Sequence, residues 1–149
     1  MTIEVLNESG HDLDVQHLAA LSRFVMDRMR VHPQAELCIK AVDEATIAEL
    51  NEKWMEKEGP TDVLAFPMDE LRPGLVNEEP EEGMLGDLVL CPAVAERQGR
   101  TAGHGTGPEL ELLTVHGILH LLGYDHAEPE EHRVMFGLQD QLLAEYRAG

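Results

Sequence analysis

The feature that most constrains this chain is an apolar segment that carries histidines, LLTVHGILHLLGYDH, from Leu112 to His126. His116 and His120 stand four residues apart, and this spacing places two side chains on one face of a helix, one turn from each other. Leucine, isoleucine and valine surround the pair on nearly every side, which predicts a buried helix. The two imidazoles then need polar partners, because an unsatisfied buried polar group costs about 1–3 kcal/mol.

A third histidine follows this helical run closely. Gly123 stands just past the apolar residues, and glycine commonly ends a helix because it adopts the left-handed conformation at little cost. The chain can then reverse and bring His126 back to His116 and His120. Three neutral imidazoles with an open fourth coordination position make a catalytic zinc site. We therefore predict one Zn²⁺ per chain, held by these three residues; the alternative is that they are ordinary hydrogen-bonded histidines of the core.

The residue after the first histidine limits the chemistry of such a site. The order His116, His120, Gly123, His126 has the spacing of the metzincin zinc peptidases. Those enzymes carry a general-base glutamate directly after the first histidine, and this chain has Gly117 there. Without that carboxylate, no neighbouring group can take a proton in the peptidase manner. The segment predicts a metal site without peptidase chemistry, and hydrolysis of another ester or amide remains an alternative.

Strand-like and helical patterns alternate around this segment. Strands are expected over residues 2–6, 36–42, 62–66 and 85–90. Helices are expected over residues 15–31, 43–54 and 92–98, through the histidine segment, and from residues 128–131 onward. Asp14 and Asp43 are suited to cap the first two helices. The glycine-rich stretch 99–108 is expected to be a flexible linker.

This order predicts one α/β (α+β) domain spanning residues 1–149. We expect a small mixed four-stranded sheet packed with helices, with the buried metal-binding helix at its centre. The chain has no signal-like start and no apolar run long enough to span a membrane, so we expect a cytoplasmic protein. Cys38 and Cys91 lie within apolar runs and are expected to be buried thiols rather than a disulfide.

The charge of the chain weighs against a nucleic-acid partner. It carries 29 acidic residues against 11 lysines and arginines, a net charge of −18, whereas proteins that bind phosphates usually present a basic face. Much of the acid is concentrated in residues 69–87, which we expect to form a solvated loop. A local basic patch could then exist elsewhere. Its candidates are Arg23, Arg28, Arg30 and Lys40, which could equally be ordinary solvated charges.

Three segments of the chain resemble a known family. HGILHLLGYDH (residues 116–126), LNEKWMEKEGPTDVLAFP (50–67) and LGDLVLCP (85–92) are similar to the YbeY endoribonucleases, bacterial metal-dependent proteins linked to ribosomal RNA maturation. The resemblance implies a zincin-like fold. It also implies a metal-dependent endoribonuclease specific for single strands, acting in maturation of the 3′ end of the small-subunit ribosomal RNA and in ribosome quality control. The implied partners are ribosomal RNA and the small ribosomal subunit, with no DNA or membrane expected.

The chain departs from this family at one position. The family usually carries an arginine, thought to help hold RNA, six residues before the Thr-Asp pair, and this chain has Met55 there. Trp54 stands where a tyrosine is common. The arginine's role therefore does not carry over to Met55. This departure and the acidic charge favour an alternative, a ribosome assembly factor without catalytic activity in which zinc only stabilises the fold.

A few other polar residues are candidates for the site. Asp125 precedes the third histidine and is the candidate for moving protons or orienting a ligand; its alternative is a turn residue. Thr61 and Asp62 match the family's Thr-Asp-Val segment, which implies that they line the substrate cleft or steady the ligands; alternatively they only begin a strand. His104 and His132 are expected to be solvated.

Overall fold

The computed structural model describes residues 2–69 and 83–149. Its elements are β1 (Thr2–Asn7), α1 (Val15–Arg28), β2 (Glu36–Ala41), α2 (Glu44–Met55), β3 (Val63–Pro67), β4 (Met84–Leu90), α3 (Pro92–Ala102), α4 (Thr106–Leu121) and α5 (Pro129–Ala148). This is the alternation that the sequence predicts. The predicted acidic loop lies largely outside the described residues, because only its two ends, residue 69 and residues 83–87, are among them.

The four strands form one mixed sheet in the order β1-β2-β4-β3. β1 pairs with β2 in parallel, from Thr2 opposite Glu36 to Asn7 opposite Ala41, and β2 pairs with β4 in parallel. β3 runs antiparallel to β4 and forms one edge of the sheet. The mixed α/β fold with a small mixed sheet, predicted from the sequence, is confirmed.

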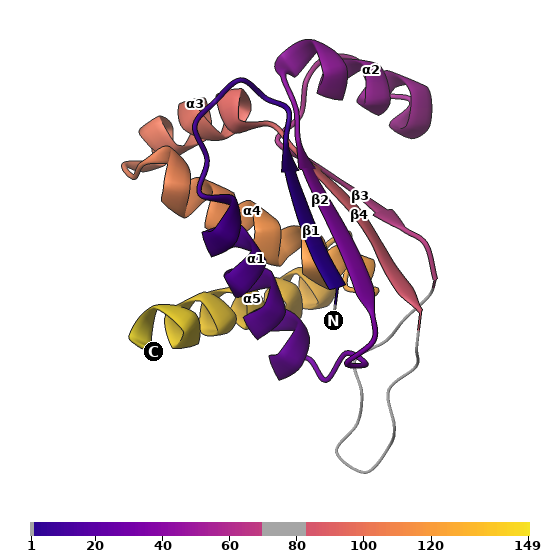
Figure 1. Ribbon diagram of the computed structural model, residues 1–149, viewed down its shortest axis with the longest axis vertical. Helices are drawn as coiled ribbons and strands as arrows, with labels where there is room; N and C mark the ends of the chain where they lie inside the picture. Colours follow the sequence, from indigo (N-terminus) through magenta and orange to yellow (C-terminus); the bar gives the residue numbers. More distant parts are fainter. Residues whose placement is uncertain (1, 70–82) are drawn as a thin grey trace.

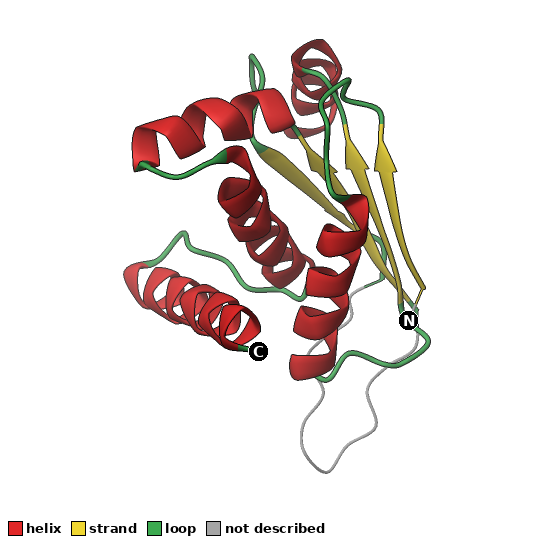
Figure 2. Ribbon diagram, turned by 60° about the vertical axis from the view of Figure 1, so that its left-hand side comes forward, coloured by secondary structure: helices red, strands yellow, loops and turns green. Residues whose placement is uncertain are grey.

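The helices divide between the two faces of the sheet (Figures 1 and 2). α1 and α4 pack against one face, with α3 and α5 packed beside α4, while α2 lies at one end of the sheet and packs there against the other face. Alternate residues of β3 follow this division, since neighbouring side chains of a strand point to opposite faces. Val63 and Ala65 pack against the main core, and Leu64 and Phe66 against a smaller cluster that includes Ile47 of α2.

α4 is the central helix of the main core. It contacts β3 and β4 on one side and α1, α3 and α5 on the others, and most of its residues are buried. It approaches β4 at Gly117, where an added Cβ would lie 2.7 Å from a methyl carbon of Leu88. Although α4 is apolar on most sides, no helix within the described ranges is long and apolar enough to span a bilayer.

The first two helices begin where the sequence predicts. The Asp14 carboxylate accepts the backbone N–H of His17 at 3.0 Å, and that of Asp43 accepts the N–H of Thr46 at 2.8 Å. Both contacts satisfy N–H groups that have no partner within the helix. Cys38 and Cys91 are both free thiols, as predicted, but only Cys91 is buried, because Cys38 of β2 is partly exposed.

The glycine-rich stretch 99–108 is not the flexible linker that its composition predicts. α3 continues to Ala102 and α4 begins at Thr106, so only a tight corner separates them. An added Cβ at Gly99 would lie 2.8 Å from the carbonyl oxygen of Gly105, so this glycine permits a close backbone approach. His104 is not simply solvated either, because its ring nitrogen pairs with the buried carboxylate of Glu109 at 2.6 Å.

Candidate metal centre

The end of α4 brings the third histidine back toward the first two. Gly123 has a φ of +99°, in the left-handed region that favours glycine, and its N–H donates to the carbonyl of His120 at 3.0 Å. The N–H of Tyr124 then donates to the carbonyl of Leu119 at 3.0 Å. These two bonds turn the chain sharply at the helix end, as the sequence predicts, and the next residues carry His126 beside the helix.

The three imidazoles converge on one point. The Nε2 atoms of His116 and His120 are 3.1 Å apart, and the ligand atoms of these two residues and His126 all lie within 4.8 Å of one another. In a tetrahedral zinc site with Zn–N distances of about 2.0–2.1 Å, two ligand nitrogens lie roughly 3.3 Å apart. The His116–His120 pair already has this spacing, and a small movement of His126 would complete it. The cluster can hold a metal ion.

The surroundings keep two of these rings in the neutral form that binds metals. Burial lowers the pKa of His116, and a nearby His126 adds to this, although the hydrogen bond with Gln139 opposes it. Burial also lowers the pKa of His120, and His116 and His126 lower it further. A metal ligand must offer a free lone pair. Both shifts favour the neutral imidazole, the form that offers such a lone pair.

Gln139 of α5 orients the first histidine, and it was not predicted from the sequence. Its side chain is only 2% exposed, and its Oε1 accepts the N–H of His116 Nδ1 at 2.9 Å. With the proton held on Nδ1, the Nε2 lone pair of His116 points at the cluster. A polar residue among the apolar residues of the inner face of α5 was the available signal for this role.

Aromatic rings from α5 cover one side of the cluster. The ring of Phe136 lies 5.5 Å from that of His116 and 5.8 Å from that of His126. His132 stacks on Phe136 at 4.2 Å with an interplanar angle of 15°. His132 is exposed, as predicted, and its ring contacts the aromatic cover rather than standing alone in solvent. Phe136 thus packs beside two of the three histidine rings on the α5 side.

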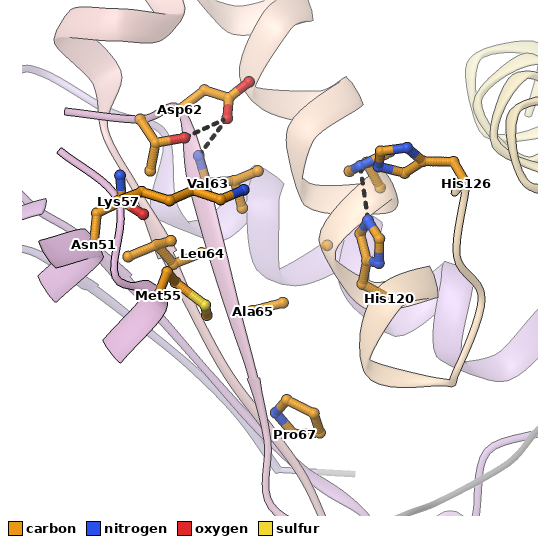
Figure 3. A pocket seen from close by; sticks show the side chains of 13 residues that line it. Asn51, Met55, Lys57, Asp62, Val63, Leu64, Ala65, Pro67, His120 and His126 are labelled. Carbon is orange, nitrogen blue, oxygen red and sulfur yellow. Dashed lines mark hydrogen bonds between the residues drawn. The ribbon is translucent and has the colours of Figure 1, made fainter. Parts of the chain in front are cut away.

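The cluster forms one wall of a cavity of about 480 Å³. Figure 3 shows the histidines on one side and residues from α2, the loop after it and β3 on the other. The described residues that line the cavity are Asn51, Met55, Lys57, Thr61, Asp62, Val63, Leu64, Ala65, Pro67, His116, Gly117, His120 and His126.

Thr61 and Asp62 lie in this cavity, as the family resemblance implies. One oxygen of Asp62 accepts the N–H of Val63 at 2.8 Å and the hydroxyl of Thr61 at 3.3 Å (Figure 3). These contacts are typical of residues that begin a strand. They therefore also support the alternative that Thr61 and Asp62 only begin β3. The Asp62 charge acts on the opposite wall too, because it raises the pKa of His116 against the larger effect of burial.

Asp125 does not belong to the described lining of the cavity. Its Oδ1 accepts the backbone N–H of His126 at 2.7 Å, a contact typical of a turn residue. It is near enough to His120 to raise the pKa of that ring against the effect of burial. A role in proton transfer stays a prediction.

The predicted basic patch consists partly of ion-paired residues. Arg28 pairs with Glu145 at 2.8 Å, and Lys40 pairs with Glu8 at 3.7 Å. Neither residue lines the cavity beside the histidines. These two cations are therefore ordinary surface charges, the alternative that the sequence left open.

Known proteins resemble this chain along almost its whole length. The family model described as Endoribonuclease YbeY matches residues 4–147. A curated protein of that name from Nocardioides sp. is 84% identical over 99% of this chain and 99% of its own length. Another from Acidothermus cellulolyticus is 61% identical over 99% of this chain and 93% of its own.

A solved structure extends the comparison to the fold. A protein from Thermotoga maritima, determined in solution, superimposes with a TM-score of 0.66 at 26% identity, covering 99% of this chain and 93% of that one. The family model spans the sheet, the central helix and all three histidines. The chain belongs to the Endoribonuclease YbeY family.

Proposed function

We propose that this chain is a metal-dependent endoribonuclease that cuts single-stranded RNA, with ribosomal RNA of the small subunit as its substrate. The observation that carries the proposal is the convergence of three histidines on one wall of an open cavity. A zinc ion bound there would act as a Lewis acid toward a phosphate oxygen. The cytoplasmic location and the small-subunit partner stay predictions from the sequence and its resemblance.

Different residues of the chain would bind the ion, orient its ligands and contact the substrate. His116, His120 and His126 would hold it, and Gln139 would keep the ring of His116 in the correct orientation. Thr61 and Asp62 face the substrate space from the other wall. A carboxylate repels phosphate but accepts hydrogen bonds, so Asp62 is suited to a ribose hydroxyl, the group that distinguishes RNA from DNA.

The number of ligands favours a catalytic role over a structural one. Structural zinc sites usually have four protein ligands, whereas catalytic sites leave one position open. Among the described residues, the cluster contains three histidines and no fourth ligand from Cys, Asp or Glu. The net charge of −18 and Met55 favour the second candidate, an assembly factor that binds the ribosome without cutting it. Peptide hydrolysis is disfavoured, because the chain has Gly117 where a zinc peptidase carries its general-base glutamate.

A cleavage assay tests this proposal. Single-stranded RNA labelled at one end is incubated with the metal-loaded chain, with the chain after metal removal, and with His116→Ala. We expect cleavage by the loaded chain alone, restored when zinc is returned to the depleted chain. His11→Ala is the matched control, because this exposed histidine lies outside the cluster, and it should cut normally.

Two results would contradict the proposal in different ways. Undiminished cleavage by the metal-free chain and by His116→Ala would show that the histidines are not needed. Intact RNA under every condition, with one metal bound per chain, would favour the assembly factor. A DNA strand of the same sequence should stay uncut by the loaded chain.

A further inference from the structure

The cavity beside the histidines has one cation on its opposite wall. Lys57 is the only lysine or arginine among the described lining residues. Figure 3 shows its side chain extending from the α2 side toward the side where the histidines lie. Among the described residues, no ion pair holds its ammonium group. Lys57 therefore brings a positive charge to the cavity of a chain whose net charge is −18.

Met55 does not supply this charge from its own position. Its side chain is partly buried and packs against the smaller core cluster under α2, which contains Ile47 and Leu64. Met55 therefore makes apolar contacts at the position where other members of the family usually have an arginine. Lys57 lies two residues further along the chain and lines the same cavity.

The backbone around Lys57 is held by a buried side chain. α2 ends at Met55, and the next residue, Glu56, adopts the left-handed conformation with a φ of 55°. The N–H of Lys57 then donates to the carbonyl of Asn51 at 3.3 Å. The side-chain amide of Asn51, which is 5% exposed, donates to the carbonyl of Gly59 at 3.0 Å. Asn51 thus hydrogen-bonds to the backbone of Lys57 and to the backbone two residues after it. These two bonds position the loop that carries Lys57.

We propose that Lys57 binds a phosphate of the RNA substrate and holds the strand against the histidine wall. This inference rests on the proposed function. The ammonium group offers three donors and a full charge to an anion. Asn51 acts as a positioning residue for the loop, and Lys57 performs in this chain the contact that Met55 cannot make.

Lys53, in the last turn of α2 and four residues before Lys57, provides a matched comparison. Its ammonium lies 5.1 Å from the ring centroid of Trp54, and it is not among the residues that line the cavity. Both lysines are exposed and both are near the end of α2. Replacing either with glutamine removes one positive charge, so a general effect of net charge would be equal for the two variants.

The test measures binding of a fluorescent single-stranded RNA to the metal-loaded chain at several salt concentrations. Each phosphate contact to a single strand contributes about 0.7 to the slope of log affinity against log salt. Lys57→Gln should bind several-fold more weakly to every sequence tested and lower the slope by about 0.7. Lys57→Arg should restore the wild-type slope, Lys53→Gln should keep it, and all variants should retain one metal per chain.

The outcomes separate this inference from the proposed function. Equal slopes for the wild type and Lys57→Gln, with RNA cleavage intact, would overturn the role of Lys57 alone. Equal losses in Lys57→Gln and Lys53→Gln would also overturn it, because they would indicate a general charge effect. Failure of the metal-loaded wild type to bind or cut any RNA would overturn both proposals.

Discussion

One hydrogen bond determines how the first histidine faces the candidate metal site. Gln139 is buried, and its amide oxygen holds the Nδ1 proton of His116. The other ring nitrogen, Nε2, therefore carries no proton and has a free lone pair. It lies 3.1 Å from the Nε2 atom of His120. Partners of this kind fix the tautomer and the orientation of a ligand.

Replacing Gln139 should therefore weaken metal binding without unfolding the chain. Gln139→Leu keeps a similar volume but removes the acceptor, so we expect metal affinity to fall by about 10- to 100-fold. Competition with a coloured chelator measures this. Gln141→Leu, at an exposed site whose amide donates to Glu145, should leave the affinity unchanged. Equal affinities for the wild type and Gln139→Leu would show that the contact does not orient the ring.

At the scale of elements, the approach of α4 to β4 depends on the absence of a side chain at Gly117. This glycine is buried in the helix, and an added Cβ would meet Leu88, which is itself fully buried. Gly137 of α5 is also helical, but a Cβ added there would have no described neighbour within 4 Å outside its own helix turn. The two positions therefore separate the effect of packing from the effect of helix propensity.

The two alanine substitutions should shift stability in opposite directions. Gly117→Ala overpacks the interface and should cost about 1–3 kcal/mol of unfolding free energy. Gly137→Ala should add about 0.5–1 kcal/mol, because alanine restricts the unfolded helix segment without new contacts. Urea unfolding measures both. A stabilising Gly117→Ala would mean that α4 and β4 are not packed closely at this point.

Local patterns predicted the elements, whereas contacts between elements could not be predicted from them. The spacing of His116 and His120, with Gly123 after them, was enough to indicate the convergence that the structure has. The stretch from residue 99 was misread, because glycine marks a close helix corner as readily as a flexible linker. The cavity wall that carries Lys57 depends on β3 lying at the sheet edge beside α4, which no local pattern reveals.

Across the whole molecule, one carboxylate ties three helices together. Glu111 of α4 pairs with His17 of α1 at 2.6 Å and with Arg147 of α5 at 2.8 Å. Burial alone would raise the pKa of the Glu111 carboxyl, but the hydrogen bonds from Arg147 and His17 outweigh it and hold the pKa below its usual value. The folded chain therefore binds this proton less readily than the unfolded chain.

This network predicts a specific loss of stability in acid. A depressed pKa in the folded state contributes stability above the unfolded value of about 4.5, and that contribution disappears as the pH falls through the lower, folded value. Glu111→Gln should be less stable than the wild type at neutral pH and should lose less on acidification. Glu52→Gln, at an exposed site on α2, should follow the wild type. Parallel curves for all three chains would contradict the network's role.

Metal removal should lower the melting temperature but leave a folded chain. The main core contains strand residues and residues of α1, α3, α4 and α5, and most of them lie outside the histidine cluster. A bound ion adds stability that grows with the logarithm of its affinity. Calorimetry with and without a chelator measures the shift, and circular dichroism reports the secondary structure at 25 °C. Complete unfolding on chelation would instead indicate a structural metal and favour the assembly-factor interpretation.

The most direct test of the account locates the metal itself. Anomalous diffraction at the zinc edge from crystals of the zinc-loaded chain should give a single peak, about 2.0–2.1 Å from a ring nitrogen of each of His116, His120 and His126. A peak elsewhere would contradict the account. So would rings that point apart with no ion between them.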